Sequence, residues 1–295
     1  MKYISKILLL FLLCSLTVLF GCTSELKNNS IDDFNFKNGK LIKYLGTDEV
    51  VVIPSSYEEN GERIDVVEIS SKAFLDNTFI KKVILSKNIK LIGDNAFDSC
   101  LRLEKIRFNN SIEEINQQAF KDCVSLENIK LPDKLNYLGP SAFSGCVSLK
   151  AVKLSESLIS INSKTFEKCI SLRTVIFSKS LYILGDSVFL GCSSLKDINV
   201  PNSVSEIGNG VFAYCVNLKT VKLSKNITTI PKNTFSNCYN LKSIKFSSNL
   251  NSIEEYAFLR CESLRKINLN GNIDCHDTAF DECINLKNLP EKEAW

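Results

Sequence analysis

The sequence contains little of the residue types on which most enzymatic chemistry depends. Its 295 residues include a single histidine, His276. That shortage argues against histidine-based acid–base catalysis and against a histidine-rich metal site. The sequence also has no HExxH, GxSxG, P-loop or dinucleotide-binding glycine motif. We therefore expect no catalytic residues, no metal and no cofactor, and we predict that the protein is not an enzyme.

A strong charge of either sign is also lacking. The chain has 36 lysines and arginines against 33 aspartates and glutamates, which gives a formal net charge of +3. Over the whole chain this excess is too small to predict nucleic-acid binding, so we expect no nucleic-acid partner. With 44% hydrophobic residues the chain can bury a large core, in one or two domains if compact and in one if repetitive.

The apolar run near the N-terminus is too short to predict a membrane-spanning helix. It extends from Ile7 to Phe20 after two lysines, and a spanning helix needs ~20 apolar residues. Residues 1–21 are therefore predicted to be a secretory signal peptide. The run ends in the sequence LFGC, which resembles the lipobox of bacterial lipoproteins and implies that Cys22 carries lipid after residues 1–21 are removed.

Two features qualify this N-terminal prediction. Phe20 departs from the small residue usual at its place in a lipobox, and an uncleaved helical anchor is the alternative. The following residues are polar and lack periodicity. We predict that residues 22–33 are a lipidated, flexible tether.

The rest of the chain is dominated by one repeat with a period of 23. Each copy opens with an aliphatic residue, has phenylalanine at position 9 and has apolar residues at positions 15, 18 and 20, the pattern of a short β-strand. Nine copies have cysteine at position 12, where the first copy has Asn77. The ten copies, the last one residue short, begin at Val66, Ile89, Ile112, Leu135, Leu158, Leu181, Val204, Ile227, Leu250 and Ile273.

This period predicts an α/β repeat solenoid. A unit this short cannot cover its own apolar face, so neighbouring copies must stack into a continuous core. We expect ten repeats over residues 66–289, each with a short parallel strand and one helical turn. Residues 34–65 contain the strand-like run EVVVIP and a turn at Glu59–Gly61, and are predicted to be an N-terminal capping unit. Residues 290–295 would form a C-terminal tail.

Copies such as VSEIGNGVFAYCVNLKTVKLSKN, residues 204–226, resemble the leucine-rich repeats of the BspA type, also called the Treponema pallidum type. The resemblance covers residues 66 to about 289, roughly three quarters of the chain. It implies a cell-surface adhesin or antigen that binds host extracellular-matrix proteins or other bacteria, and it implies no enzymatic residues. Together with the lipobox, it predicts a surface-exposed monomer anchored through Cys22 to the cell membrane or outer membrane.

The cysteines at position 12 are predicted to be buried, unpaired thiols. Equivalent side chains in adjacent repeats are parallel and about one strand spacing apart, whereas a disulfide needs Cβ atoms at ~3.5–4.5 Å that point toward each other. Cys275 lies outside this series, close in sequence to His276 and Cys283. A terminal disulfide or a metal site is one interpretation there, and an irregular C-terminal cap is the other. In the second case we expect His276 to fill the apolar place shifted by the deletion.

Positions 16, 17 and 19 flank or alternate with the core positions of each strand, so we expect them to face solvent. In nine copies these 27 places hold fifteen basic residues, opposed only by Glu104, Glu127 and Asp197. The face has two interpretations: it binds an acidic glycan, an acidic protein surface or an anionic envelope polymer, or its lysines only keep an exposed sheet soluble. The candidate ligand-binding residues are Lys130, Lys150, Lys153, Arg173, Lys196, Lys219, Lys222, Lys242, Lys245 and Arg265.

The sequence thus favours a cell-surface binding or adhesion lipoprotein that presents its repeats to a host or bacterial macromolecule. Large repeat surfaces suit that use. The alternative is a passive structural or antigenic envelope lipoprotein without a defined ligand.

Overall fold

The computed structural model describes residues 29–269 and 273–287. The chain divides into two compact units, Met1–Ser30 and Ile31–Trp295, and all that follows concerns the second. The predicted signal peptide, Cys22, most of the predicted tether and the 290–295 tail lie outside the described residues. Among the residues that are described, no helix has the length and apolar character needed to cross a membrane.

The described chain begins with a short 3-10 helix and two hairpins. The helix η1 spans Ile31–Asp33, at the C-terminal end of the predicted tether. The antiparallel pairs are β1 (Phe34–Lys37) with β2 (Lys40–Tyr44), and β4 (Ser56–Glu59) with β5 (Glu62–Asp65). Asn60 and Gly61, both at positive φ, form the turn between β4 and β5.

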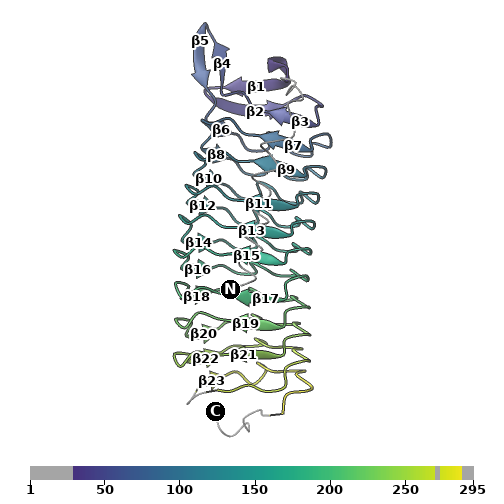
Figure 1. Ribbon diagram of the computed structural model, residues 1–295, viewed down its shortest axis with the longest axis vertical. Helices are drawn as coiled ribbons and strands as arrows, with labels where there is room; N and C mark the ends of the chain where they lie inside the picture. Colours follow the sequence, from purple (N-terminus) through teal and green to yellow (C-terminus); the bar gives the residue numbers. More distant parts are fainter. Residues whose placement is uncertain (1–28, 270–272, 288–295) are drawn as a thin grey trace, which may run out of the picture. The chain divides into compact units, whose positions relative to one another are not determined.

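Two rows of short parallel strands follow, stacked one repeat above the next (Figure 1). Each strand pairs with its counterpart one repeat further along, as in Val152↔Val175, so equivalent positions of successive repeats are neighbours. From β7 onward the first row occupies positions 17–19 of the repeat, within the segment from position 15 to position 20 that was predicted to be a strand. It contains β3 (Val50–Val52), β7 (Lys82–Ile84), β9 (Lys105–Arg107), β11 (Asn128–Lys130), β13 (Ala151–Lys153), β15 (Thr174–Ile176), β17 (Asp197–Asn199), β19 (Thr220–Lys222) and β21 (Ser243–Lys245).

The second row consists of two-residue strands at positions 3 and 4 of the repeat, and it continues from β2. At position 4 the side chain points into the core, whereas the position 3 side chain is at least partly exposed. The strands are β6 (Glu68–Ile69), β8 (Leu91–Ile92), β10 (Glu114–Ile115), β12 (Tyr137–Leu138), β14 (Ser160–Ile161), β16 (Ile183–Leu184), β18 (Glu206–Ile207), β20 (Thr229–Ile230), β22 (Ser252–Ile253) and β23 (Asp274–Cys275).

The prediction of one helical turn per repeat is wrong, and with it the α/β class: the described repeats form a β-solenoid. Positions 7 and 11 adopt positive φ, for example 60° at Lys164 and 57° at Lys168, which a right-handed helix excludes. The backbone N–H groups there also bond outside their own repeat. Lys164, Phe166 and Lys168 donate to carbonyl oxygens of the next repeat, at Asp186 (2.9 Å), Val188 (3.0 Å) and Leu190 (2.7 Å).

A column of phenylalanine rings runs through the core. From Phe74 to Phe280 each position 9 ring stacks on the next, with centroids 4.6 to 5.8 Å apart. Phe74 also stacks on Tyr44 at 5.3 Å, so the N-terminal hairpins continue the same column. The position 9 rings are almost fully buried. Each ring therefore depends on neighbouring repeats for its burial, as the period predicted.

The position 12 cysteines are confirmed as buried, unpaired thiols: all ten cysteines of the described residues are free. Each position 12 thiol donates a hydrogen bond to the carbonyl oxygen of the position 9 phenylalanine in the preceding repeat, at 3.0 to 3.2 Å. Asn77 instead accepts hydrogen bonds from the N–H groups of Phe79 and Ile80. The cysteines thus link successive repeats without covalent bonds.

The prediction that His276 fills the apolar place of the last repeat is also wrong. The strand register pairs Ile253 with Cys275, so the cysteine takes the inward position and is 5% exposed. His276 is exposed, and its Nδ1 lies 2.9 Å from the Thr278 hydroxyl. The one-residue deletion therefore lies between Ile273 and Cys275, before the inward place rather than after it.

Candidate ligand-binding face

The ten candidate basic residues lie on or directly before the strands β11 to β21, or at the equivalent place in the ninth repeat. Nine are exposed, and Lys153 is partly exposed. Residues at position 19 are direct neighbours across the sheet where their strands pair, as in Lys130↔Lys153 and Lys222↔Lys245. The repeat register therefore brings these cations together on one face.

The most regular part of this face is position 16, directly before each strand. From the fourth repeat onward every described repeat has a basic residue there. Backbone bonds join several of these positions directly: Lys219 N–H donates to the Lys196 carbonyl oxygen at 2.7 Å, and Lys287 N–H to that of Arg265 at 3.2 Å. We call this set the basic strip; it consists of Lys150, Arg173, Lys196, Lys219, Lys242, Arg265 and Lys287.

Most of the basic strip has no acidic partner. Lys150 forms an ion pair with Glu127 at 2.9 Å, and within residues 29–269 and 273–287 no other residue of the strip forms one. The N-terminal repeats differ, because Glu49 binds both Lys81 (2.8 Å) and Arg102 (3.0 Å). The hydrogen bond from Lys81 lowers the pKa of the Glu49 carboxyl. Among the described residues of position 16, the positive charge is therefore paired with a carboxylate at Lys81 and Lys150 and has no acidic partner beyond Lys150.

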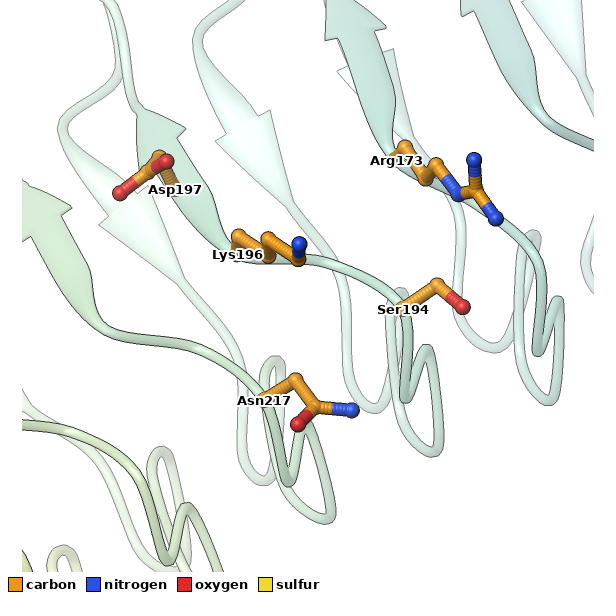
Figure 2. Close-up of a pocket in the computed structure, with 5 residues that line it drawn as sticks. All are labelled: Arg173, Ser194, Lys196, Asp197 and Asn217. Atoms are coloured by element: carbon orange, nitrogen blue, oxygen red, sulfur yellow. The ribbon is translucent and has the colours of Figure 1, made fainter.

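A shallow surface depression of about 390 Å³ opens along the strip in the fifth to seventh repeats. It is lined by Arg173, Ser194, Lys196, Asp197 and Asn217. Figure 2 shows the Asp197 carboxylate directed away from the side chains of the other four. That carboxylate accepts a hydrogen bond from the Thr220 hydroxyl on the next strand. The floor of the depression thus presents two cations, a hydroxyl and an amide.

A second depression, of about 240 Å³, has the same composition three repeats further along. It is lined by Lys242, Ser263, Arg265 and Asn285. Both depressions use position 16 of two successive repeats and position 14 of the second and third. Charged hydrogen-bond donors beside neutral polar groups can bind sulfate or carboxylate groups, but neither depression contains a nucleophile with an adjacent general base.

Sequence reasoning found position 16 but missed position 14. Eight consecutive repeats, from Ser125 to Asn285, have serine or asparagine there, and this uniformity was the available signal. The missed residues that line the depressions are Ser194, Asn217, Ser263 and Asn285. Lys287 was also absent from the predicted set. Across the described residues, no group of three or more His, Cys, Asp or Glu side chains could hold a metal ion.

The stacked repeat coils, the phenylalanine column and the exposed parallel strands define a leucine-rich-repeat solenoid. The chain belongs to the BspA-type leucine-rich-repeat family. The sequence model described as "BspA type Leucine rich repeat region (6 copies)" matches residues 67–196 and 159–287. Proteins of this family are typically found at the cell surface, their solenoids generally bind proteins, and no enzyme family is indicated.

Several solved structures are similar to the chain. A leucine-rich cell surface protein from Faecalibacterium prausnitzii A2-165 is 20% identical, with a TM-score of 0.58 and coverage of 93% of this chain and 98% of that one. A leucine-rich repeat protein from Bacteroides ovatus is 26% identical, with a TM-score of 0.42 and coverage of 88% and 93%. The T. pallidum leucine-rich repeat protein is 27% identical, with a TM-score of 0.39 and coverage of 81% and 91%. No curated protein sequence is similar to the chain.

Proposed function

We propose that the protein is an exported lipoprotein, anchored through Cys22 to the cell membrane or outer membrane and exposed at the cell surface. Its solenoid binds a host or bacterial macromolecule, either a protein or an acidic glycan, and it performs no catalysis. The observation that carries this proposal is the basic strip, a row of cations on an exposed sheet face in which, among the described residues, only Lys150 has an acidic partner.

Two physical arguments support binding through this face. A row of like charges attracts a polyanion over a distance and speeds its association, an effect that salt weakens. Like charges at neighbouring positions also repel one another and destabilise the folded chain. An anionic ligand would remove that repulsion, because each cation would gain a counter-charge on binding.

The alternative function is a passive structural or antigenic envelope lipoprotein. Lysine on exposed sheets prevents unwanted pairing with other chains, and solubility alone would favour it. The two functions differ in one property. A solubilising face binds nothing saturably, whereas a ligand-binding face does.

The proposal is tested on intact cells that carry the full chain. Wild-type cells are expected to bind immobilised host matrix or partner bacteria saturably, with binding that weakens as salt is raised. Reversal of Lys219, Lys222, Lys242 and Lys245 to glutamate is expected to abolish it. The control reverses four exposed lysines outside the strand positions, Lys72, Lys164, Lys168 and Lys179, so that the change in net charge is the same.

Two further measurements make the outcome decisive. Cys22→Ser is expected to release the protein from the membrane, because a lipid chain contributes about 0.8 kcal/mol of membrane binding per buried CH₂. Protease added to intact cells is expected to degrade the wild-type solenoid. A solenoid that survives this treatment, on cells that show no saturable binding, would establish the passive function instead.

A further inference from the structure

The geometry points to a linear polyanionic polysaccharide, sulfated or bearing uronates, as the ligand of the basic strip. This inference rests on the proposed function and names its ligand class. The polymer lies along the stack, across the strands, with its anionic groups on successive repeats and its hydroxyls on the position 14 side chains. The site extends from Lys150 to Lys287.

The first argument is that the two depressions are copies of one binding unit. The first uses Arg173 and Lys196 as its cations, and the second uses Lys242 and Arg265. The corresponding residues are 69 positions apart, which equals three repeats (242 − 173 and 265 − 196). Binding units that recur at a fixed interval on one line suit a polymer that repeats a chemical group at a fixed interval.

The second argument concerns the polar groups beside the cations. The Asn217 amide is held by a hydrogen bond from its NH₂ group to the Ser193 carbonyl oxygen at 2.8 Å, and Asn285 makes the same bond to Glu262. Each amide is thus oriented before a ligand arrives, with its carbonyl oxygen able to accept from a sugar hydroxyl. Ser194 and Ser263 provide hydroxyls at the equivalent places. Groups of this kind recognise polyols as well as anions.

The third argument is the length and regularity of the row. Strands in a sheet lie ~4.8 Å apart, so the seven cations of the basic strip form a line of roughly 29 Å. A folded protein partner rarely presents so long and regular a line of negative charge. An extended polysaccharide with an anion on every sugar or every second sugar presents one along its whole length.

The composition of the depressions argues against two other polymers. Protein interfaces concentrate their binding energy in buried aromatic and arginine anchors, and single-stranded nucleic acids are bound by stacking on aromatic rings. Neither depression is lined by an aromatic or an aliphatic residue, and the arginine in each, Arg173 or Arg265, is exposed rather than buried. Both are lined by charged and polar residue types alone, so affinity must come from many weak ionic and hydrogen-bond contacts summed along the chain.

The N-terminal end of the site is set by a reversal of charge. The equivalent places three repeats before those of the first depression hold Glu104, Ser125, Glu127 and Ser148. The same unit is therefore present there with carboxylates in place of cations. These carboxylates repel an anionic polymer, and Glu127 also neutralises Lys150.

The test measures binding of heparin oligosaccharides to the full chain purified in detergent, with neutral dextran as the uncharged probe. Affinity for heparin is expected to rise from tetrasaccharide to octasaccharide to dodecasaccharide, and dextran is not expected to bind. The combined variant Lys196→Gln, Lys219→Gln and Lys242→Gln removes three cations of the strip. Its affinity is expected to fall on the order of tenfold or more, at typical values for exposed ion pairs.

A matched variant removes the same charge from the same sheet outside the strip, by Lys130→Gln, Lys222→Gln and Lys245→Gln. It is expected to reduce affinity much less, because position 19 does not line either depression. Conversely, Glu104→Lys with Glu127→Lys extends the strip by two repeats. This variant is expected to bind the longest oligosaccharide more tightly than the wild type does. Circular dichroism confirms that all three variants are folded.

Equal losses in the two glutamine variants would overturn the inference, since they would show only attraction to net charge. An affinity that is independent of oligosaccharide length would overturn it as well. If wild-type cells bind matrix protein or bacteria saturably but the purified chain does not bind heparin, the polysaccharide assignment fails and the proposed function stands. If the cells bind neither matrix protein nor bacteria and the purified chain does not bind heparin, the proposed function itself fails.

Discussion

The thiol of Cys215 donates a hydrogen bond to the carbonyl oxygen of Phe189, 3.2 Å away in the preceding repeat. The same bond recurs for each position 12 cysteine, so the thiols form a second column that connects repeats beside the phenylalanine rings. A thiol can donate this bond only while it is protonated. The column therefore makes the stability of the solenoid depend on pH.

The first prediction is a steep loss of stability in alkali. Burial raises the pKa of Cys215 and of Cys100 to about 12, from an ordinary value near 9. Below pH 9 both the folded and unfolded chains keep their thiols protonated, so the stabilisation is fully present there. Between pH 9 and about 12 only the unfolded chain loses these protons. Each such thiol then lowers the free energy of unfolding by up to about 1.4 kcal/mol per pH unit.

This prediction is checked by urea unfolding at a series of pH values from neutral to about pH 10.5. The variant Cys100→Ala with Cys215→Ala is expected to be less stable at pH 7, because it loses two hydrogen bonds and buried volume. Its stability is expected to fall less steeply above pH 9 than that of the wild type. The two chains differ only at these two thiols, so parallel slopes above pH 9 would refute the thiol explanation.

The second prediction concerns the phenylalanine column. Phe143 is fully buried between Phe120 and Phe166, with centroid distances of 5.1 and 5.8 Å. Phe143→Ala is expected to lower the free energy of unfolding by about 3–5 kcal/mol, the usual range for a buried phenylalanine. Because each repeat is stabilised by its two neighbours, the change also weakens the connection between the two halves of the stack. Urea unfolding followed by circular dichroism measures both effects.

The matched control for that change is Phe280→Ala. Phe280 is 6% exposed and, among the described residues, stacks only on Phe258, at 5.1 Å. Phe280→Ala is expected to lower the free energy of unfolding clearly less than Phe143→Ala does. The variant should still unfold in a single cooperative transition. Equal losses at the two sites would mean that stability does not depend on nearest-neighbour stacking.

The third prediction isolates the cost of the positive φ at position 11. Gly191 has a φ of 73°, and an added Cβ would meet nothing nearer than 3.6 Å. Gly191→Ala therefore introduces left-handed strain without a clash, and is expected to lower stability by about 1 kcal/mol. Lys168 occupies the same place one repeat earlier, at a φ of 57°. Lys168→Gly is expected to change stability in the opposite direction, and thermal unfolding of the two variants decides whether the signs differ.

The positive φ at positions 7 and 11 also explains why the predicted helical turn does not form. The segment between the two strand rows carries phenylalanine, alanine and cysteine at intervals of three and four, which favours a helix. A helix is excluded by the positive φ at positions 7 and 11. Glycine occupies these places in only three repeats, and elsewhere they hold Lys, Ser, Asp, Asn, Gln, Tyr, Arg or Glu. Tertiary hydrogen bonds between repeats hold them in that conformation, and a single repeat carries no local signal of those bonds.

Other features were predictable because they follow directly from apolar spacing. The stacked phenylalanines, the buried cysteines and the strand at positions 17–19 each depend on side chains that recur once in every repeat. The second strand row was missed because a two-residue strand such as β16 has one inward side chain and no alternation to detect. In the candidate site, charge identified position 16. The uniform serine and asparagine at position 14 were overlooked because they are neutral, and their role was recognised when the structure placed Ser194 and Asn217 beside the cations.

The last prediction tests where the tenth repeat loses its residue. Cys275 pairs with Ile253 and is 5% exposed, and burial raises the pKa of its thiol to about 11. Cys275→Ile restores the residue found at the same position in the two preceding repeats, as Ile230 and Ile253, and is expected to stabilise the fold by about 1 kcal/mol through added apolar burial. His276→Ile is the matched control, and because His276 is exposed its effect is expected to stay within about 0.5 kcal/mol. A deletion after the inward position would reverse the two results, because His276 would then be the buried residue, so urea unfolding of both variants distinguishes the two registers.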